Sequence, residues 1–233
     1  MKKSTLATWL IFLVVIPATI FLGAKIPGRN YYITGTLIVL ELLIPFFMAF
    51  EGRKVQAREL VILAVMCALA IAGRVAIPFP HFKAIFAIIM ITGVVFGPEA
   101  GFMVGAISAL ASNFFYGQGA YTPWQMLAYG AGGMLAGFCF RRNGLLPRKP
   151  WALAFFGGFV VLFVVGPLMD CAGIFLMLSH ITWKTAGLML ASGMIYANLS
   201  LAISTAISML LFGKPLLKRL DRIQRKYGMI EGQ

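Results

Sequence analysis

Residues 152–179 read ALAFFGGFVVLFVVGPLMDCAGIFLMLS, an apolar run that contains one charged residue, Asp170. About 20 consecutive apolar residues form a helix long enough to cross the hydrocarbon core of a bilayer, so this run predicts a transmembrane helix. Seven further runs, bounded by charged residues, glycine and proline, carry the same pattern: 5–24, 32–50, 60–77, 84–97, 100–116, 122–140 and 186–212. The run at 84–97 is short and ends abruptly at Gly97-Pro98, which leaves a tilted or re-entrant segment open.

Composition places the chain among polytopic membrane proteins. Of its 233 residues, 61% are hydrophobic and 12% are charged, and the mean hydropathy is +0.90. Soluble domains contain about 45–50% apolar and about 25% charged residues. Disordered chains need low hydrophobicity and are excluded by the same numbers. The three cysteines, Cys67, Cys139 and Cys171, lie singly in apolar stretches and have no metal-ligand spacing.

The positive charges predict the orientation of the spans. The net charge is +13, and the basic residues lie between the apolar runs, which favours a topology signal over nucleic-acid binding. With eight spans and a cytoplasmic N-terminus, fifteen of the 20 Lys and Arg residues lie on the cytoplasmic side. Such a bias follows the positive-inside rule and predicts that both termini are cytoplasmic. The segment after residue 213 is then a basic cytoplasmic helix end near anionic headgroups.

Polar and aromatic residues gather in three loops predicted to face outward, at 74–83, 113–125 and 179–184. Aromatic walls with a few polar groups line small-molecule pockets. An interfacial belt of Trp and Tyr is the alternative, but a belt does not need the Asn, Gln and Thr found at 113–125. The candidate binding residues of these loops are Arg74, His81, Lys83, Asn113, Tyr116, Gln118, Tyr121, Trp124, Gln125, His180 and Trp183.

Two polar residues inside predicted spans, Asp170 and Asn198, join this candidate set. An ionisable group within a span is a functional hypothesis by default, because it must face a partner or water. Asp170 either lines the binding cavity, makes a structural hydrogen bond or forms an ion pair with Arg74. The cavity rim carries Arg74, Lys83 and Lys184, which favours a neutral or anionic ligand over a cation.

Small residues recur four positions apart in several spans, which is typical of helices that approach closely in lipid. The ridges are Ala64/Ala68/Ala72, Gly101/Gly105/Ala109, Gly133/Gly137 and Ala202/Ala206. Internal packing is the first interpretation of each ridge, and a lipid-facing ridge would instead dock another protein.

The sequence contains no phosphate-binding G-x-x-x-x-G-K-[ST] loop, no HExxH and no G-x-S-x-G, so it does not support catalysis or ATP hydrolysis by this chain.

A further pattern connects the outer segments. FGPEAGFMVG at 96–105 is followed by SNFF at 112–115, GQG at 117–119 and TPWQM at 122–126. This order resembles the substrate-binding S-components of energy-coupling-factor (ECF) vitamin transporters, over about residues 58–226. The resemblance implies an all-α polytopic membrane protein of the bacterial cytoplasmic membrane. The resemblance implies a six-helix core at 58–213, followed by a basic tail at 214–233. The first two spans depart from this six-helix pattern and would be two extra transmembrane helices at 1–57.

The resemblance also implies a function. An S-component captures a vitamin in an outward-facing cavity, and a transmembrane coupling subunit with two cytoplasmic ATPases releases it inside. Ala64, Ala68 and Ala72 match the alanine spacing that docks the coupling subunit. The pattern is most similar to the cobalamin (corrinoid) members, in which His81 or His180 would approach the cobalt or simply form hydrogen bonds. Pantothenate or another small anionic vitamin is the alternative ligand, and no metal or cofactor of the chain's own is expected.

A function of another class stays open at this point. An integral membrane enzyme at the outer leaflet would need a catalytic pair, and Asp170 with His180 is the available candidate. An assembly factor without a ligand is the third possibility, for which the polar outer loops would have no use.

Overall fold

The computed structural model describes residues 10–25, 31–51, 57–76, 82–140, 145–177 and 182–226, and these contain helices but no strand. The predicted all-α fold is therefore confirmed. The helices, with single π-helical turns labelled η, are η1 (Ile11–Val15), α2 (Ile16–Lys25), α3 (Tyr31–Glu51), α4 (Ala57–Val75), α5 (Ile85–Phe96), α6 (Pro98–Tyr116), α7 (Thr122–Phe140), α8 (Pro150–Val160), η2 (Val161–Val165), α9 (Gly166–Met177), α10 (Trp183–Gly193), η3 (Met194–Asn198), α11 (Leu199–Ser208), η4 (Met209–Gly213) and α12 (Lys214–Lys226).

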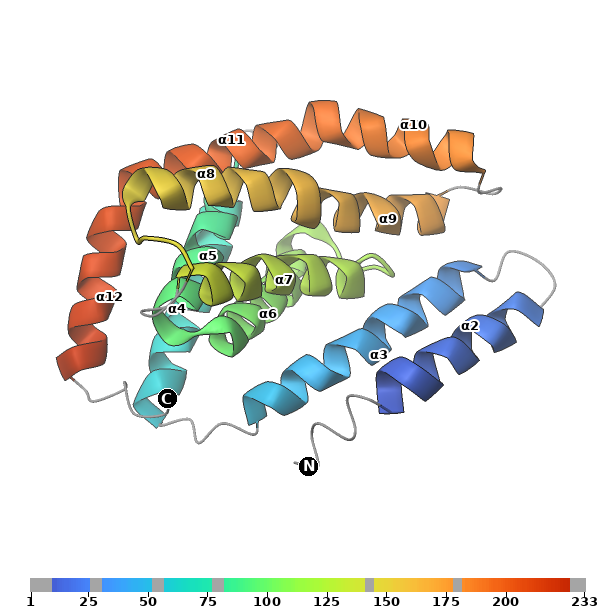
Figure 1. Cartoon of the computed structure of the whole chain (residues 1–233), viewed down its shortest axis with the longest axis horizontal. Coiled ribbons are helices and arrows are strands. Elements are labelled where there is room, and N and C mark those ends of the chain that lie inside the picture. The colour runs from blue at the N-terminus through green and yellow to red at the C-terminus, as the bar shows by residue number, and fades with distance from the viewer. Residues whose placement is uncertain are drawn as a thin grey trace.

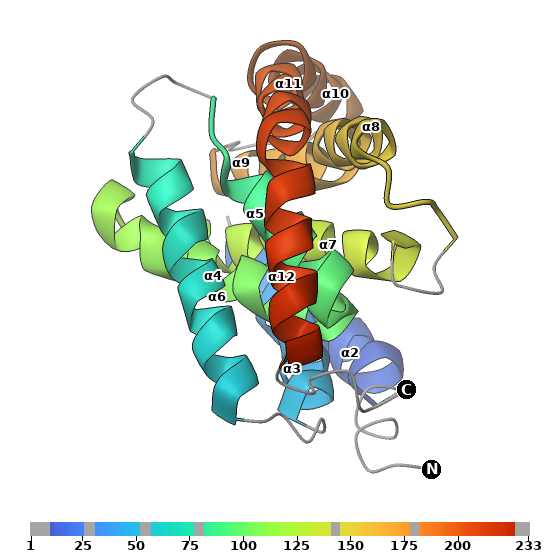
Figure 2. The same ribbon diagram turned by 90° about the vertical axis from the view of Figure 1, so that its left-hand side faces the viewer.

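The helices form three groups in space. α8–α9 and α10–α11 run side by side along one side of the molecule, and α2 and α3 lie on the opposite side (Figures 1 and 2). α6 and α7 lie between these groups and pack extensively against each other and against α5. The candidate site is built around the ends of these central helices.

The number of long apolar helices differs from the eight membrane spans predicted from the sequence. Among the described residues, two helical runs are long and apolar enough to cross a membrane, judged by length and composition: Pro150–Phe175 and Trp183–Lys226. The second run joins the predicted span 186–212 and the basic tail into one continuous helix. Pro215 lacks the amide donor of a regular helix, and the π-helical turn η4 precedes it. α12 accordingly bends away from α11 at a steep angle (Figure 1).

The run at 84–97 was predicted as a span, but it is the short core helix α5. Its 12 residues extend about 18 Å, well below the roughly 30 Å of a hydrocarbon core. Every residue of α5 except Ile88 is buried in the bundle. Gly97, with φ of 97°, turns the chain, and Pro98 begins α6 at the position where a missing amide costs nothing. α5 is apolar because other helices surround it.

Glycines allow α5, α6 and α7 to touch through their backbones. A Cβ atom on Gly101 would lie 2.7 Å from the carbonyl carbon of Gly133, and one on Gly105 would lie 2.6 Å from that of Tyr129. Gly137 faces Pro98 in the same way, at 2.6 Å. The internal-packing interpretation of these two glycine ridges is therefore confirmed.

Arg148 ties the ends of two helices, α5 and α7, to α12 at one end of the bundle. Its Nη2 donates to Val94 O at 2.8 Å and its Nε to Phe140 O at 2.7 Å, which satisfies carbonyls at the ends of α5 and α7. Its Nη1 lies 3.3 Å from Oδ1 of Asp221 in α12. Gln224 adds a bond from Nε2 to Val95 O at 3.1 Å. The described part of the basic tail is thus a helix, α12, docked on the core.

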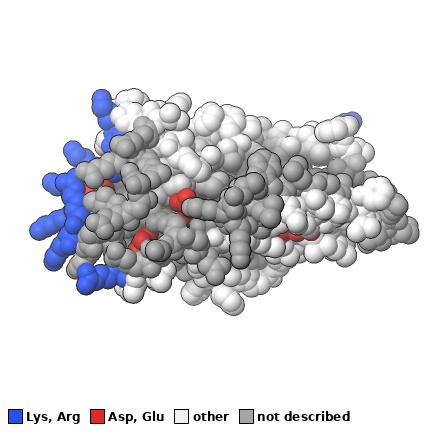
Figure 3. Space-filling view, turned by 60° about the horizontal axis from the view of Figure 1, so that its bottom comes forward, with Lys and Arg blue, Asp and Glu red and all other residues white. Residues whose placement is uncertain are grey.

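The outer face of α12 is strongly cationic. Leu217 and Leu220 are buried against the core, while the basic side chains of the helix are exposed: Lys214, Lys218, Arg219, Arg222, Arg225 and Lys226. Figure 3 shows that Lys and Arg gather at the end of the molecule where α12 lies. This distribution agrees with the predicted basic helix end.

Candidate binding site

The loop between α6 and α7 is held by its own side chains. Gly117, with φ of 97°, ends α6 in a conformation that other residues rarely adopt. The Gly119 amide donates to Oγ1 of Thr122 at 3.2 Å, and the Tyr121 hydroxyl donates to the Gly117 carbonyl. Thr122 in turn donates to Oε1 of Gln118 at 3.0 Å. These bonds fix the start of α7 relative to the end of α6.

Asn113 is the centre of a buried polar network between α4, α6 and α7. Its Oδ1 accepts from Nη1 of Arg74 at 2.9 Å. Its Nδ2 donates to Oγ1 of Thr122 at 3.2 Å and to Oε1 of Gln125 at 2.8 Å. Both amide protons are therefore used, so Asn113 positions its neighbours and has no donor left for a ligand.

Arg74 brings a positive charge into this network. It donates to Ser112 Oγ as well as to Asn113, and its guanidinium lies 4.9 Å from the ring centroid of Tyr116 and 5.6 Å from that of Tyr129. Nζ of Lys83 approaches the same Tyr116 ring at 6.0 Å. Within the described part of the chain, no carboxylate forms an ion pair with Arg74. The site therefore suits a ligand with acceptor or anionic groups.

The site has two halves. The polar half is the network around Asn113, and the aromatic half is formed by Trp124 and the side chains packed on it. Trp124, 7% exposed, stacks on Phe175 of α9 with ring centroids 5.4 Å apart and an interplanar angle of 22°. Val39 of α3 and Ala172 complete the cluster. Trp124 and Gln125 are adjacent in the first turn of α7, so this turn carries both the aromatic and the polar half. A ligand with a flat ring and polar edges matches such a pair of surfaces.

Asp170 and Asn198 form a separate polar pair. Nδ2 of Asn198 donates to Oδ2 of Asp170 at 2.7 Å. Among the alternatives left open for Asp170, this contact favours the structural hydrogen bond, while Arg74 bonds to Ser112 and Asn113 instead. Asn198 is the last residue of the π-helical turn η3. π-helical turns are frequent at functional sites, so Asp170 and Asn198 are candidate functional residues outside the Asn113 network.

The structure brings most predicted residues together and leaves others apart. Lys83, Tyr116, Gln118 and Tyr121 surround the polar network, although Gln118 and Tyr116 are exposed. Trp183 is 97% exposed at the start of α10 and stands away from the network. The two predicted histidines, His81 and His180, lie outside the described residues.

Three residues that contribute to the site were not predicted from the sequence. Ser112 and Thr122 lie in the quoted motifs, where their small polar side chains could have been taken as partners of Asn113. Phe175 lies in a long apolar run and carries no sequence signal, because only the fold shows that it stacks on Trp124.

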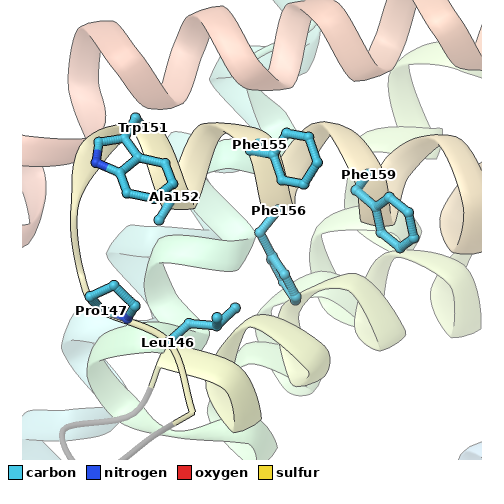
Figure 4. Close-up of a pocket in the computed structure, with 7 residues that line it drawn as sticks. All are labelled: Leu146, Pro147, Trp151, Ala152, Phe155, Phe156 and Phe159. Atoms are coloured by element: carbon cyan, nitrogen blue, oxygen red, sulfur yellow. The ribbon is translucent and has the colours of Figure 1, made fainter.

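An apolar groove on α8 has a different character. It has a volume of about 260 Å³ and is lined by Leu146, Pro147, Trp151, Ala152, Phe155, Phe156 and Phe159. Figure 4 shows these side chains on α8 and on the segment before it. None of them was predicted as a binding residue, and none has a charged group to orient a polar ligand. The groove is therefore not the candidate binding site.

Taken together, an apolar all-helical chain with a polar and aromatic site at the ends of its central helices defines a membrane protein that binds a small molecule. A family model described as "ECF-type riboflavin transporter, S component" matches residues 54–221, and the chain belongs to this family. The match begins after α3 and includes most of α12. Comparison with curated proteins and with solved structures found no match.

The family match confirms two predictions from the sequence, the S-component family and the role in transport. The chain is an S-component, a membrane subunit for vitamin uptake, and the family is one of transporter subunits rather than enzymes. An enzyme built on Asp170 and His180 therefore has no support. The cobalamin-type assignment has no support either, because the matching family model is of the riboflavin type.

Proposed function

We propose that this chain captures a vitamin from outside the cell and delivers it to the cytoplasm together with a coupling subunit and two ATPases. The observation that carries the proposal is the buried network around Asn113, which joins α4, α6 and α7 next to the Trp124–Phe175 stack. Folding a buried polar network into an apolar bundle is costly unless every member is bonded. Its position beside the exposed side chains of Phe114, Phe115 and Tyr116 supports a binding role.

The proposed cavity faces outward, and α7 gives the reason. The C-terminal end of α7 is tied through Arg148 to the basic helix α12, whereas its N-terminal end carries the site. α7 has 19 residues and is about 28 Å long, close to the thickness of a hydrocarbon core of about 30 Å. With α12 on the cytoplasmic side, as the positive-inside rule favours, the site opens on the other side and both termini are cytoplasmic.

Riboflavin is the ligand we propose. The matching family model names riboflavin, and a flavin presents a flat ring system with carbonyl oxygens. The Arg74 guanidinium offers donors to such oxygens, and the aromatic half suits the ring. Cobalamin and pantothenate, the ligands expected from the sequence, are competitors in the test.

The proposed docking surface for the coupling subunit is the outer face of α4. Ala64, Ala68 and Ala72 lie one turn apart and all three are exposed. Small exposed residues let a partner helix approach closely in lipid, whereas alanines have little other use on a lipid-facing surface. The two ATPases would act through that partner.

Ligand titration tests the proposal. Riboflavin fluorescence is followed while the detergent-purified chain is added, with cobalamin and pantothenate offered as unlabelled competitors. We expect saturable quenching that neither competitor reverses. Trp124→Ala should weaken binding by at least tenfold, because the aromatic half loses its central ring. Trp183→Ala is the matched control, since this exposed residue stands apart from the site. Absence of quenching by the folded wild type would overturn the assignment of riboflavin.

A further inference from the structure

The α2–α3 hairpin lies outside the family match, yet α3 packs on the candidate site. The match begins at residue 54, whereas α3 ends at Glu51. α3 contacts α6, α7 and α9. Val39, 1% exposed, packs with Trp124 and Ala172. The hairpin is therefore more than a membrane anchor placed beside an independent core.

The contact between α3 and the aromatic half of the site is close. A Cβ atom on Gly35 would lie 3.2 Å from Cζ2 of Trp124 and 3.4 Å from Cγ of Phe175. At 3.2 Å the neighbouring ring would have to shift, so the glycine allows the α3 backbone to lie directly against the stacked pair. The helix thereby closes one side of the Trp124–Phe175 stack.

Two buried polar atoms, one on α7 and one on α3, lack hydrogen-bond partners. Among the residues that the structure describes, neither Nε1 of Trp124 nor Oγ1 of Thr36 has a partner, and both atoms are buried. Thr36 directly follows Gly35 in α3. Buried polar groups in native proteins are almost always bonded, so an orphan atom on each of these two packed helices indicates a partner that the chain itself does not supply.

We propose that α3 forms one wall of the substrate site, where Trp124 and Thr36 bind acceptor atoms of the vitamin. The indole N–H only donates, so the ligand atom opposite it is a carbonyl oxygen or a ring nitrogen of a flat heteroaromatic ring. The hairpin then contributes to ligand specificity, which the core matched by the family model would not determine alone. This inference rests on the proposed vitamin capture and goes beyond it.

Two conservative variants test the role of α3 in the full-length detergent-purified chain. Thr36→Val removes the hydroxyl at nearly constant volume, and Trp124→Phe removes the N–H but keeps an aromatic ring. We expect each to raise the Kd for riboflavin about three- to tenfold, as the loss of one hydrogen bond does. Leu37→Ala, on the exposed side of the same helix, is the control and should change the Kd by less than twofold.

Hydrogen–deuterium exchange of the wild type provides a second measurement that needs no variant. Riboflavin should slow exchange of the backbone amides of residues 33–43. Unchanged Kd values in both variants, or exchange of this segment that does not respond to riboflavin, would overturn the role of α3. Failure of the wild type to bind riboflavin at all would overturn the proposed function instead, so the two failures are distinguishable.

Discussion

The Asp170 carboxylate accepts a hydrogen bond of 2.7 Å from the Asn198 amide and so joins α9 to η3. A glycine faces each partner. An added Cβ atom on Gly193 would collide with the Asp170 carboxylate, and one on Gly166 would collide with the Asn198 amide. The pair is therefore part of the close contact between these two helical runs, and its geometry depends on both glycines.

Gly193→Ala should destabilise the fold by pushing the Asp170 carboxylate away from Asn198. We expect a loss of about 1–3 kcal/mol, the cost of leaving a buried polar group unsatisfied. Thermal unfolding in detergent, followed by loss of the monodisperse peak, measures it. Gly187→Ala in the same helix is the control, because nothing lies within 4 Å of its added Cβ atom. Equal melting temperatures for the two variants would contradict this role of the glycine.

Arg74→Lys tests the polar half of the site. Lysine keeps the charge but loses the planar fork that reaches Ser112 and Asn113 together, so riboflavin affinity should fall about tenfold. Arg58→Lys, the same change near the other end of α4, should leave the Kd unaltered. A fluorescence titration compares them. If both variants bind like the wild type, the guanidinium has no part in recognition.

Asn113→Ala should lower both stability and affinity, because the residue is completely buried and bonds to three side chains. We expect a loss of about 1–3 kcal/mol in folding free energy, since the partners are left unsatisfied. Melting temperature and Kd are measured on the same preparation. A variant with normal stability and lost binding would mean that Asn113 contacts the ligand directly.

Arg148→Gln should release α12 from the core. The variant loses the guanidinium bonds to Val94 O and Phe140 O along with the Asp221 pair, so trypsin should cut α12 much faster. Asp221→Asn should have a small effect, because the ion pair is partly exposed and such pairs contribute about 0–1 kcal/mol. Equal cleavage rates for the two variants would show that the carbonyl contacts do not hold α12.

Replacing Ala64 and Ala68 by leucine should abolish uptake without affecting capture. The bulky side chains would keep a partner helix away from α4, while Arg74, at the C-terminal end of the helix, is unchanged. Riboflavin uptake by cells that express the whole transporter is compared with the Kd of the purified chain. Ile203→Leu on the exposed face of α11 serves as the control. Normal uptake by the alanine variants would exclude this face as the docking surface.

The sequence was most informative where apolar runs end at glycine, proline or charge. The expected helix at 122–140 has the observed bounds of α7, and the span predicted at 100–116 differs from α6 only in its first residues. The sequence misjudged α5, because an apolar helix buried in a bundle and one exposed to lipid have the same composition. It also ended the last span at 212, since Gly213 and Pro215 are typical of a helix end, whereas η4 carries the helix through to α12.

The binding site was only partly predictable for a related reason. Asn113, Trp124 and Gln125 stood out because polar and aromatic residues are rare together in an apolar chain. Phe175 and Gly35 did not, because their role depends on helices that are distant in sequence meeting at Trp124. Local patterns contain no information about such contacts.

Native mass spectrometry of the detergent-purified chain, offered equal amounts of riboflavin, cobalamin and pantothenate, tests the central claim most directly. The claim is that this chain alone captures a vitamin, before any coupling subunit or ATPase is present. We predict a single retained ligand with the mass of riboflavin. A well-folded chain that retains none of the three would contradict capture by the isolated subunit, and retained cobalamin or pantothenate would contradict the choice of ligand.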